Sequence, residues 1–149
     1  VMGDNTRSYY ETIGGGTGAG KGFAGASGVH VHMSNTAITD PEILEWRFPV
    51  RLHRFAIRTG SGGNGKWNGG DGLIRELEFL EPQTISLLGQ NRAEGPYGLA
   101  GGLPGECGRQ TVIRADGTKM ALEFAAQIEM KPGDRLVIET PGGGGFGSA

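Results

Sequence analysis

Two closely spaced histidines mark the most reactive stretch of the sequence, residues 28–36 (GVHVHMSNT). Side chains at i and i+2 of an extended strand point to the same face, so we expect the imidazoles of His30 and His32 to lie together. Paired imidazoles can bind a metal ion or pass protons, but a metal site needs a third ligand. The nearest candidates along the sequence are Asp40, Glu42 and His53. The alternative is that both histidines bond to backbone groups and only fix the loop.

Short polar side chains follow the histidines. Asn35 and Thr36, with Thr39 and Asp40 close behind, place amide, hydroxyl and carboxylate groups just before a predicted helix start. Such groups can hold a small polar ligand or an anion, and they also form turns and helix caps. Both interpretations stay open for Asn35 and Thr36, while Asp40 is favoured as the cap.

A glycine loop precedes the histidines. Residues 15–21 (GGTGAGK) match the first seven positions of a P-loop, whose backbone N–H groups and lysine cradle phosphates. Gly22 stands where Ser or Thr must bind magnesium, and residues 23–28 contain too many glycines for the helix that must follow. We therefore expect a loop that packs or lines a cleft, with Lys21 able to face a substrate anion.

Glycine dominates the composition, with 30 of the 149 residues where average usage gives roughly ten. It has no Gly-X-Y period and gathers in four stretches, 14–28, 60–72, 95–105 and 142–147. The length suits one domain over residues 1–149, and the apolar fraction of 36% predicts a modest core surrounded by loops. In the last stretch, disorder and close packing around Phe146 are equal alternatives.

Charge and cysteine content limit the possible partners. The net charge is -2 with no basic run, so we expect no nucleic-acid partner. No apolar run approaches the ~20 residues of a membrane span. The single cysteine, Cys107, suggests a reducing compartment, and we expect a cytoplasmic protein. The opening residues resemble the middle of a protein, so we expect an excised piece.

The periodicity predicts a mainly β domain. Segments of strand length rich in branched apolar residues are 50–58, 73–80, 84–88, 111–114 and 135–140, and 121–130 is favoured as a further strand. The turns at 81–83 and 131–134 should each join neighbouring antiparallel strands. Arg75 interrupts the alternation of 73–80 and is expected to pair across the strand. One short helix over 40–46 must end before Pro49. We predict an antiparallel β-sandwich or an irregular barrel with long glycine-rich loops.

Several motifs in fixed order resemble the late part of hydantoinase B and 5-oxoprolinase. They are residues 10–20 (YETIGGGTGAG), 28–36, 39–42 (TDPE), 49–52 (PVRL), 60–72, 96–102 (PYGLAGG) and 139–147 (ETPGGGGFG). The resemblance covers nearly the whole chain, which would be only the carboxyl-terminal part of a typical family member.

The resemblance implies an ATP-dependent enzyme that hydrolyses a small lactam or imide ring. A hydantoinase A-like subunit or domain would handle ATP and Mg, mainly outside this chain, and the remainder of the hydantoinase B-like chain would complete the cleft. The residues expected to bind substrate are Lys21, His30, His32, Asn35 and Thr36; no residue is assigned to catalysis or to a metal. Two alternatives remain, an assembly module without catalytic residues and an independent metal-binding domain.

Overall fold

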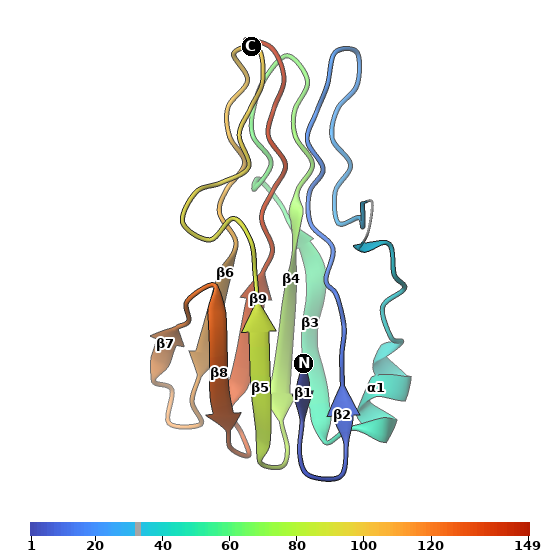
Figure 1. Ribbon diagram of the computed structural model, residues 1–149, viewed down its shortest axis with the longest axis vertical. Coiled ribbons are helices and arrows are strands. Elements are labelled where there is room, and N and C mark those ends of the chain that lie inside the picture. The colour runs from blue at the N-terminus through green and yellow to red at the C-terminus, as the bar shows by residue number, and fades with distance from the viewer. Residues whose placement is uncertain (32–33) are drawn as a thin grey trace.

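Two antiparallel sheets form the lower part of the molecule in the computed structural model, which describes residues 1–31 and 34–149 (Figure 1). The four-stranded sheet has the order β2-β1-β5-β8. Its strands are β1 (Met2–Gly3), β2 (Ser8–Tyr9), β5 (Gln83–Leu88) and β8 (Ala125–Met130). The five-stranded sheet has the order β3-β4-β9-β6-β7. Its strands are β3 (Val50–Arg58), β4 (Gly72–Phe79), β6 (Arg109–Ile113), β7 (Lys119–Ala121) and β9 (Arg135–Glu139).

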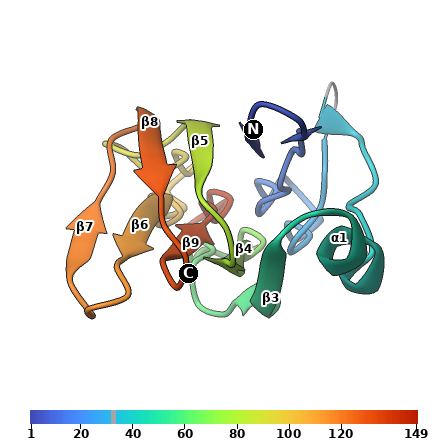
Figure 2. The same cartoon turned by 90° about the horizontal axis from the view of Figure 1, so that it is seen from below.

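The two sheets face each other as layers of a sandwich (Figure 2). The core between them contains nine buried apolar residues: Met2, Leu44, Val50, Leu77, Phe79, Ile85, Val112, Met130 and Leu136. The sandwich prediction is therefore confirmed, and the sheets do not close into a barrel.

Most predicted strands are found within one or two residues of their expected bounds. The strand at 50–58 has the predicted limits, and 121–130 divides between the end of β7 and β8. The two-residue strands β1 and β2 were not predicted, because two residues show no periodicity.

The expected role of the two turns was wrong. The turn at 81–83 leads from β4 to β5 and the turn at 131–134 from β8 to β9, so each passes from one sheet to the other. A hairpin would place both strands in one sheet and leave the apolar face of Leu77 and Phe79 uncovered. Crossing between sheets lets Ile85 of β5 join the buried core that covers this face.

Helix α1 (Pro41–Arg47) lies close to its predicted position. The Asp40 carboxylate caps it by accepting bonds from the N–H groups of Glu42 at 2.9 Å and Ile43 at 3.4 Å. Leu44 is its buried residue, and the helix ends at Phe48, which is extended as expected for a residue before proline. No helix in residues 1–31 and 34–149 is long and apolar enough to cross a membrane.

The other end of the molecule is a bundle of the four glycine-rich segments, 14–28, 60–72, 95–105 and 142–147, which we call the glycine bundle (Figure 1). Its segments are joined by backbone hydrogen bonds, such as Gly143 N to Gly70 O at 2.8 Å and Gly145 N to Leu103 O at 2.9 Å. The last segment is therefore closely packed, not disordered.

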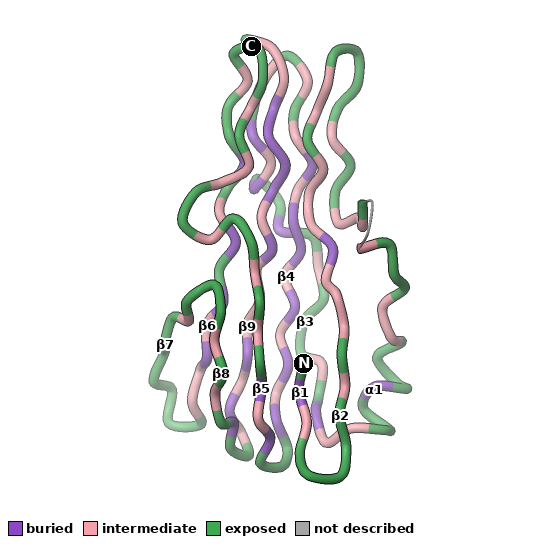
Figure 3. Tube along the Cα trace, viewed as in Figure 1, coloured by how far each residue is buried: buried purple, intermediate pink, exposed green. Residues whose placement is uncertain are grey.

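Residues 142–145 are all buried at the centre of this bundle (Figure 3). A Cβ atom on each would overlap a backbone carbonyl oxygen of one neighbour, in order Ser61, Thr17, Tyr97 and Asn64. The first and the last of these four glycines both face the 60–72 segment. The side of the chain that faces a given neighbour therefore repeats every three residues, as it does in a polyproline II helix. Only glycine fits a chain surrounded on three sides in this way.

Candidate functional site

The P-loop-like segment does not present its backbone to a ligand. Five of the N–H groups in residues 15–21 already donate to backbone oxygens within the protein. Their acceptors are Val29, Pro141, Ala26, Gly144 and Phe23, at 2.9 to 3.1 Å. Residues 21–22 form a hairpin turn between Gly20 and Phe23, and no helix follows. The segment thus lacks both the free amide groups and the helix N-terminus of a phosphate-binding loop.

Lys21 lies at the exposed tip of this hairpin, while the pairing of Gly15 with Val29 closes its base. The chain from Phe23 to Val29 spans six residues, or roughly 20 Å if fully extended. The structure therefore separates Lys21 from His30 along the length of the glycine bundle.

His30 is half-buried next to the base of the hairpin. Its Nδ1 atom is buried and has no hydrogen-bond partner within the described part of the chain. A buried imidazole nitrogen without a partner is costly, which favours a contact with a further molecule over a purely local role. His32 lies outside the described residues, so whether the two imidazoles share a face stays a prediction.

Asn35 and Thr36 are exposed in the segment that leads to α1. The Thr36 N–H donates to the Ser34 carbonyl at 2.8 Å, and the Ser34 hydroxyl donates to the Val31 carbonyl at 3.0 Å. These bonds form a tight turn, in line with the turn-forming alternative, and leave both predicted side chains facing outward.

Two of the three side chains considered as a third metal ligand have other contacts. Asp40 caps α1, and His53 Nε2 lies 2.6 Å from the Glu78 carboxylate across β3 and β4. The bond from His53 holds the pKa of Glu78 below its usual value. Among residues 1–31 and 34–149, no three His, Cys, Asp or Glu side chains gather in the geometry of a metal site.

Two clefts open beside the bundle. The inner cleft, of about 600 Å³, lies between residues 9–17 and residues 85–92, with Val31 and Ser34 also in its wall. The outer cleft, of about 880 Å³, is lined by residues 89–94, 108–111 and 121–124.

Arg92 lines both clefts, as expected for a loop residue at the edge of a cleft. Its guanidinium fits against Gly89 and Gly108, where a Cβ would overlap it. Its Nη1 donates to the Gln90 carbonyl at 2.9 Å, and its Nε is buried with no partner in the described chain. Burial and the nearby Arg58 charge lower the pKa of Arg92. A guanidinium with spare donors between two clefts can bind an anion or carboxylate.

A buried ion pair forms part of the inner cleft wall. The Glu11 carboxylate accepts bonds from Arg75 Nε at 2.7 Å and Nη2 at 3.0 Å, and from the Tyr9 hydroxyl at 2.7 Å. Burial raises the pKa of Tyr9, which remains a donor. Arg75 also lies over the Phe55 ring, 5.2 Å from its centroid. Arg75 thus finds its charged partner in the N-terminal segment, and its cross-strand neighbour Phe55 supplies only a ring.

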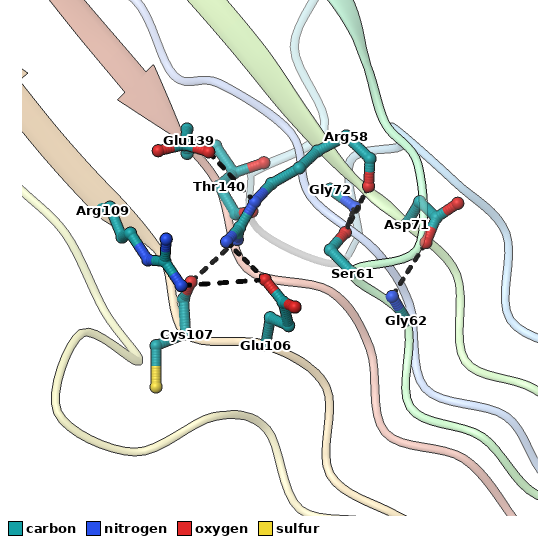
Figure 4. A network of polar contacts seen from close by, with 10 residues as sticks. All are labelled: Arg58, Ser61, Gly62, Asp71, Gly72, Glu106, Cys107, Arg109, Glu139 and Thr140. Carbon is teal, nitrogen blue, oxygen red and sulfur yellow. Dashed lines mark hydrogen bonds and ion pairs between the residues drawn. The ribbon is translucent and has the colours of Figure 1, made fainter.

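Another buried arginine, Arg58 at the end of β3, binds the segments that lead from the glycine bundle into β6 and from β9 into the bundle (Figure 4). Arg58 Nη1 donates to the carbonyls of Cys107 at 2.8 Å and Thr140 at 3.2 Å, and Nη2 donates to Glu106 at 2.7 Å. Its Nε lies 3.4 Å from the Glu139 carboxylate. Every guanidinium nitrogen thus contacts a local partner, so Arg58 has a structural role. Nothing in the sequence indicated this, because the partners come from distant segments.

These features define a β-sandwich domain with a bundle of glycine-rich segments at one end, two clefts at their junction, and no phosphate-binding loop in the described residues. Residues 1–149 match the family described as Hydantoinase B/oxoprolinase, and the chain belongs to this family. The resemblance inferred from the ordered motifs is confirmed.

Three matches cover between 72% and 99% of the chain. The 5-oxoprolinase 1 of Arabidopsis thaliana is 52% identical over 148 residues, which are 99% of this chain and 12% of the plant protein. The caprolactamase subunit beta of Pseudomonas jessenii is 35% identical over 113 residues, 72% of this chain and 19% of the subunit. The crystal structure of ATP-dependent caprolactamase from Pseudomonas jessenii superposes with a TM-score of 0.75 at 29% identity, covering 91% of this chain and 24% of that chain. The chain therefore spans about 12% of the length of its plant relative.

Proposed function

We propose that this chain is the carboxyl-terminal domain of the B-type component of an ATP-dependent cyclic amidase, with 5-oxoproline as the expected substrate. The observation that carries the proposal is 52% identity to a 5-oxoprolinase over 99% of the chain. Caprolactamase, another relative, is named for a different lactam. The relatives therefore support hydrolysis of a cyclic amide more firmly than they support 5-oxoproline as the particular substrate.

The chemistry requires an energy source because amide resonance makes the ring carbonyl a poor electrophile. Transfer of the terminal phosphoryl group of ATP to the amide oxygen turns that oxygen into a leaving group. Water then adds to the carbon and the ring C–N bond breaks, which leaves an acyl phosphate on the opened chain. A second water hydrolyses this acyl phosphate, so the products are the open amino acid, ADP and phosphate. In this scheme the chain does not bind ATP through residues 15–21, because five of the seven amide groups of that segment donate to the protein's own backbone. ATP and Mg bind mainly outside this chain.

The chain contributes binding groups. His30, with its unpartnered Nδ1, is the strongest of the predicted substrate-binding residues, and Arg92 adds donors that suit the carboxylate of 5-oxoproline. Lys21, His32, Asn35 and Thr36 remain predictions as substrate contacts. Since Lys21 lies far along the bundle from His30, it would contact a different part of the assembly.

The proposed partners are a hydantoinase A-like subunit or domain and the remainder of the B-type chain. The name of the caprolactamase relative, subunit beta, supports a multi-subunit arrangement. A reducing, ATP-containing cytoplasm suits both the chemistry and the single Cys107.

The test uses the full-length protein purified with its A-type partner. With ATP and 5-oxoproline we expect glutamate and phosphate to appear in equal amounts, and with hydantoin or caprolactam much less product. If none of the three rings stimulates phosphate release, the proposed reaction is wrong. The chain of residues 1–149 alone should be inactive, and ring opening by this chain would contradict the dependence on a partner.

An assembly module without substrate contacts is the second candidate. Large apolar side chains with most of their surface exposed favour it, among them Leu88 at 85%, Trp46 at 80% and Tyr97 at 77%. His30→Ala and Arg92→Met separate the two roles, because substrate contacts raise KM while the complex stays intact on size-exclusion chromatography. Loss of the complex with unchanged KM in what remains would favour the assembly module.

The metal-binding alternative has a direct test. Metal content is measured in the full-length protein before and after His30→Ala and His32→Ala. Loss of a bound equivalent in both variants would support a metal site at the histidines, and an unchanged content would remove it.

A further inference from the structure

One of the two shortest strands of the four-stranded sheet, β1, lies between two other strands. β1 has only two residues, yet it lies between β2 and β5 and pairs with both. Val1 extends this pairing, since its amino group donates to the Ser86 carbonyl and the Ser86 N–H donates to the Val1 carbonyl, both at 2.9 Å. Exchange of both bonds defines a hydrogen-bonded pair of an antiparallel ladder.

The strands on either side continue past this pair. β5 runs on to Leu88, and the chain after β2 runs through residues 10–13 on the opposite side. The inner cleft lies between these two backbones, with Val1 and Met2 at its foot. A sheet thus has a gap of one strand's width above β1 (Figure 1).

The backbone N–H and C=O groups along the gap point in the directions that a pairing strand needs. In an antiparallel ladder every second residue faces the same neighbour, so the N–H and C=O of Leu88 point to the same side as those of Ser86. Gly89 confirms the alternation, because its N–H donates to Phe124 on the β8 side at 2.7 Å. On the other border, Met2 pairs with Tyr9, and two residues further along Glu11 faces the gap in the same way.

Most of the side chains on the floor of the gap are apolar. The side chains that line it from the opposite sheet include Leu77, Leu136 and Ile138, and Ile85 and Leu87 line it from β5. Met2 is 5% exposed and points into this core. A strand continuing β1 would therefore carry apolar side chains at every second position, starting with the residue immediately before Val1.

We propose that the inner cleft is filled, from its foot up to Gly89, by the segment that immediately precedes Val1 in the full-length protein. This segment extends β1 and pairs with β5 and with residues 10–13. Its register follows from the Val1–Ser86 pair: the residue before Val1 lies opposite Leu87 and Glu11, and the residue before that lies opposite Leu88 and Thr12. The relatives contain ample polypeptide for this role, since this chain covers 12% of the plant protein.

If this segment fills the lower part of the inner cleft, only the upper end of that cleft, at Arg92 and Pro141, remains for a ligand. The proposed strand rests on the proposed position of this chain after further polypeptide, but it does not depend on which reaction the full-length protein performs.

Hydrogen exchange of the unmodified full-length protein is the first test. We expect the Leu88 amide to exchange about 100-fold more slowly than an unstructured amide, without any substrate. The Gly89 amide, which bonds to Phe124, is the internal control and should be protected in any case. An unprotected Leu88 beside a protected Gly89 would overturn the proposal, and so would protection that appears only when 5-oxoproline is added.

A disulfide test fixes the register. In the full-length Cys107→Ser protein, a cysteine placed immediately before Val1 should form a disulfide with Leu87→Cys, because non-hydrogen-bonded partners lie about 4.5 Å apart at Cα. The same cysteine combined with Leu88→Cys is the matched control, since Leu88 points to the other face of the sheet. Crosslinking of the control in preference, or of neither pair in folded protein, would overturn the proposal.

Discussion

The Glu11 carboxylate and the Arg75 guanidinium form a two-bond ion pair between the N-terminal segment and β4, with the Arg75 side chain only 1% exposed. Removing one partner of a buried pair leaves an uncompensated charge, while replacing both is much less costly. We therefore expect Arg75→Met to lower the free energy of unfolding by about 3 kcal/mol, and Glu11→Gln added to it to recover a large part. Urea unfolding of the single and double variants measures both.

The matched control for this pair is Arg7, which lies 2.7 Å from Glu81 with both side chains substantially exposed. Arg7→Gln should cost far less than Arg75→Met, because solvent screens exposed pairs. Equal losses for Arg7→Gln and Arg75→Met would contradict the structural importance assigned to the Glu11–Arg75 pair.

Gly143 and Gly18 test the packing of the glycine bundle. A Cβ on Gly143 would overlap the Thr17 carbonyl, whereas the nearest atom to a Cβ on Gly18 is Gly144 O at 3.8 Å. Gly143→Ala should therefore cost roughly 3 kcal/mol or prevent folding, while Gly18→Ala should stay within about 1 kcal/mol of the parent. Thermal unfolding followed by circular dichroism measures both, and similar melting temperatures for the two variants would contradict the close packing.

The limits of sequence-based prediction follow from this packing. Strands such as 50–58 and the cap at Asp40 depend on neighbouring residues, so their pattern was visible along the chain. The glycine bundle depends on which segment faces each glycine, and contacts such as Gly143 with Thr17 join residues far apart in the sequence. The sequence left disorder and close packing near Phe146 as equal alternatives and could not indicate the partners.

In the candidate site too, features that depend on neighbouring residues could be predicted, and contacts between distant segments could not. The sequence singled out His30, because two closely spaced histidines beside a glycine-rich loop are visible locally. It could not show that Glu11 pairs with Arg75, although the break in alternation at Arg75 was a signal that this side chain needed a partner. Nor could it show that the turn at 131–134 crosses between sheets, since turn residues fix a bend and not the sheet that follows.

The Asp134 carboxylate makes the free energy of unfolding depend on pH in the acid range. Burial raises its pKa, but bonds from the Lys131 N–H, the Arg114 guanidinium and the Ala115 N–H together outweigh this and hold the pKa below 3.8. Its contribution to stability is therefore present above pH 3.8 and is lost as the pH falls through the lower folded-state pKa. Asp134→Asn should destabilise the protein by about 2 kcal/mol at pH 7 and flatten the decline below pH 4. Urea unfolding between pH 2.5 and 7 measures this, and parallel curves for parent and variant would contradict it.

Substitution of Lys21 distinguishes a nucleotide-binding role of this side chain from a substrate-binding role. Because five of the seven amide groups in residues 15–21 make internal bonds, Lys21→Ala in the complete enzyme should leave the KM for ATP within about twofold of the parent. If Lys21 faces the anionic group of the ring substrate, the same variant should raise only the KM for that substrate. Lys66→Ala is the matched control, because Lys66 lies in the same bundle over the Trp67 ring, 4.9 Å from its centroid. A rise of tenfold or more in the KM for ATP, seen for Lys21→Ala and not for Lys66→Ala, would mean that the hairpin tip contacts nucleotide.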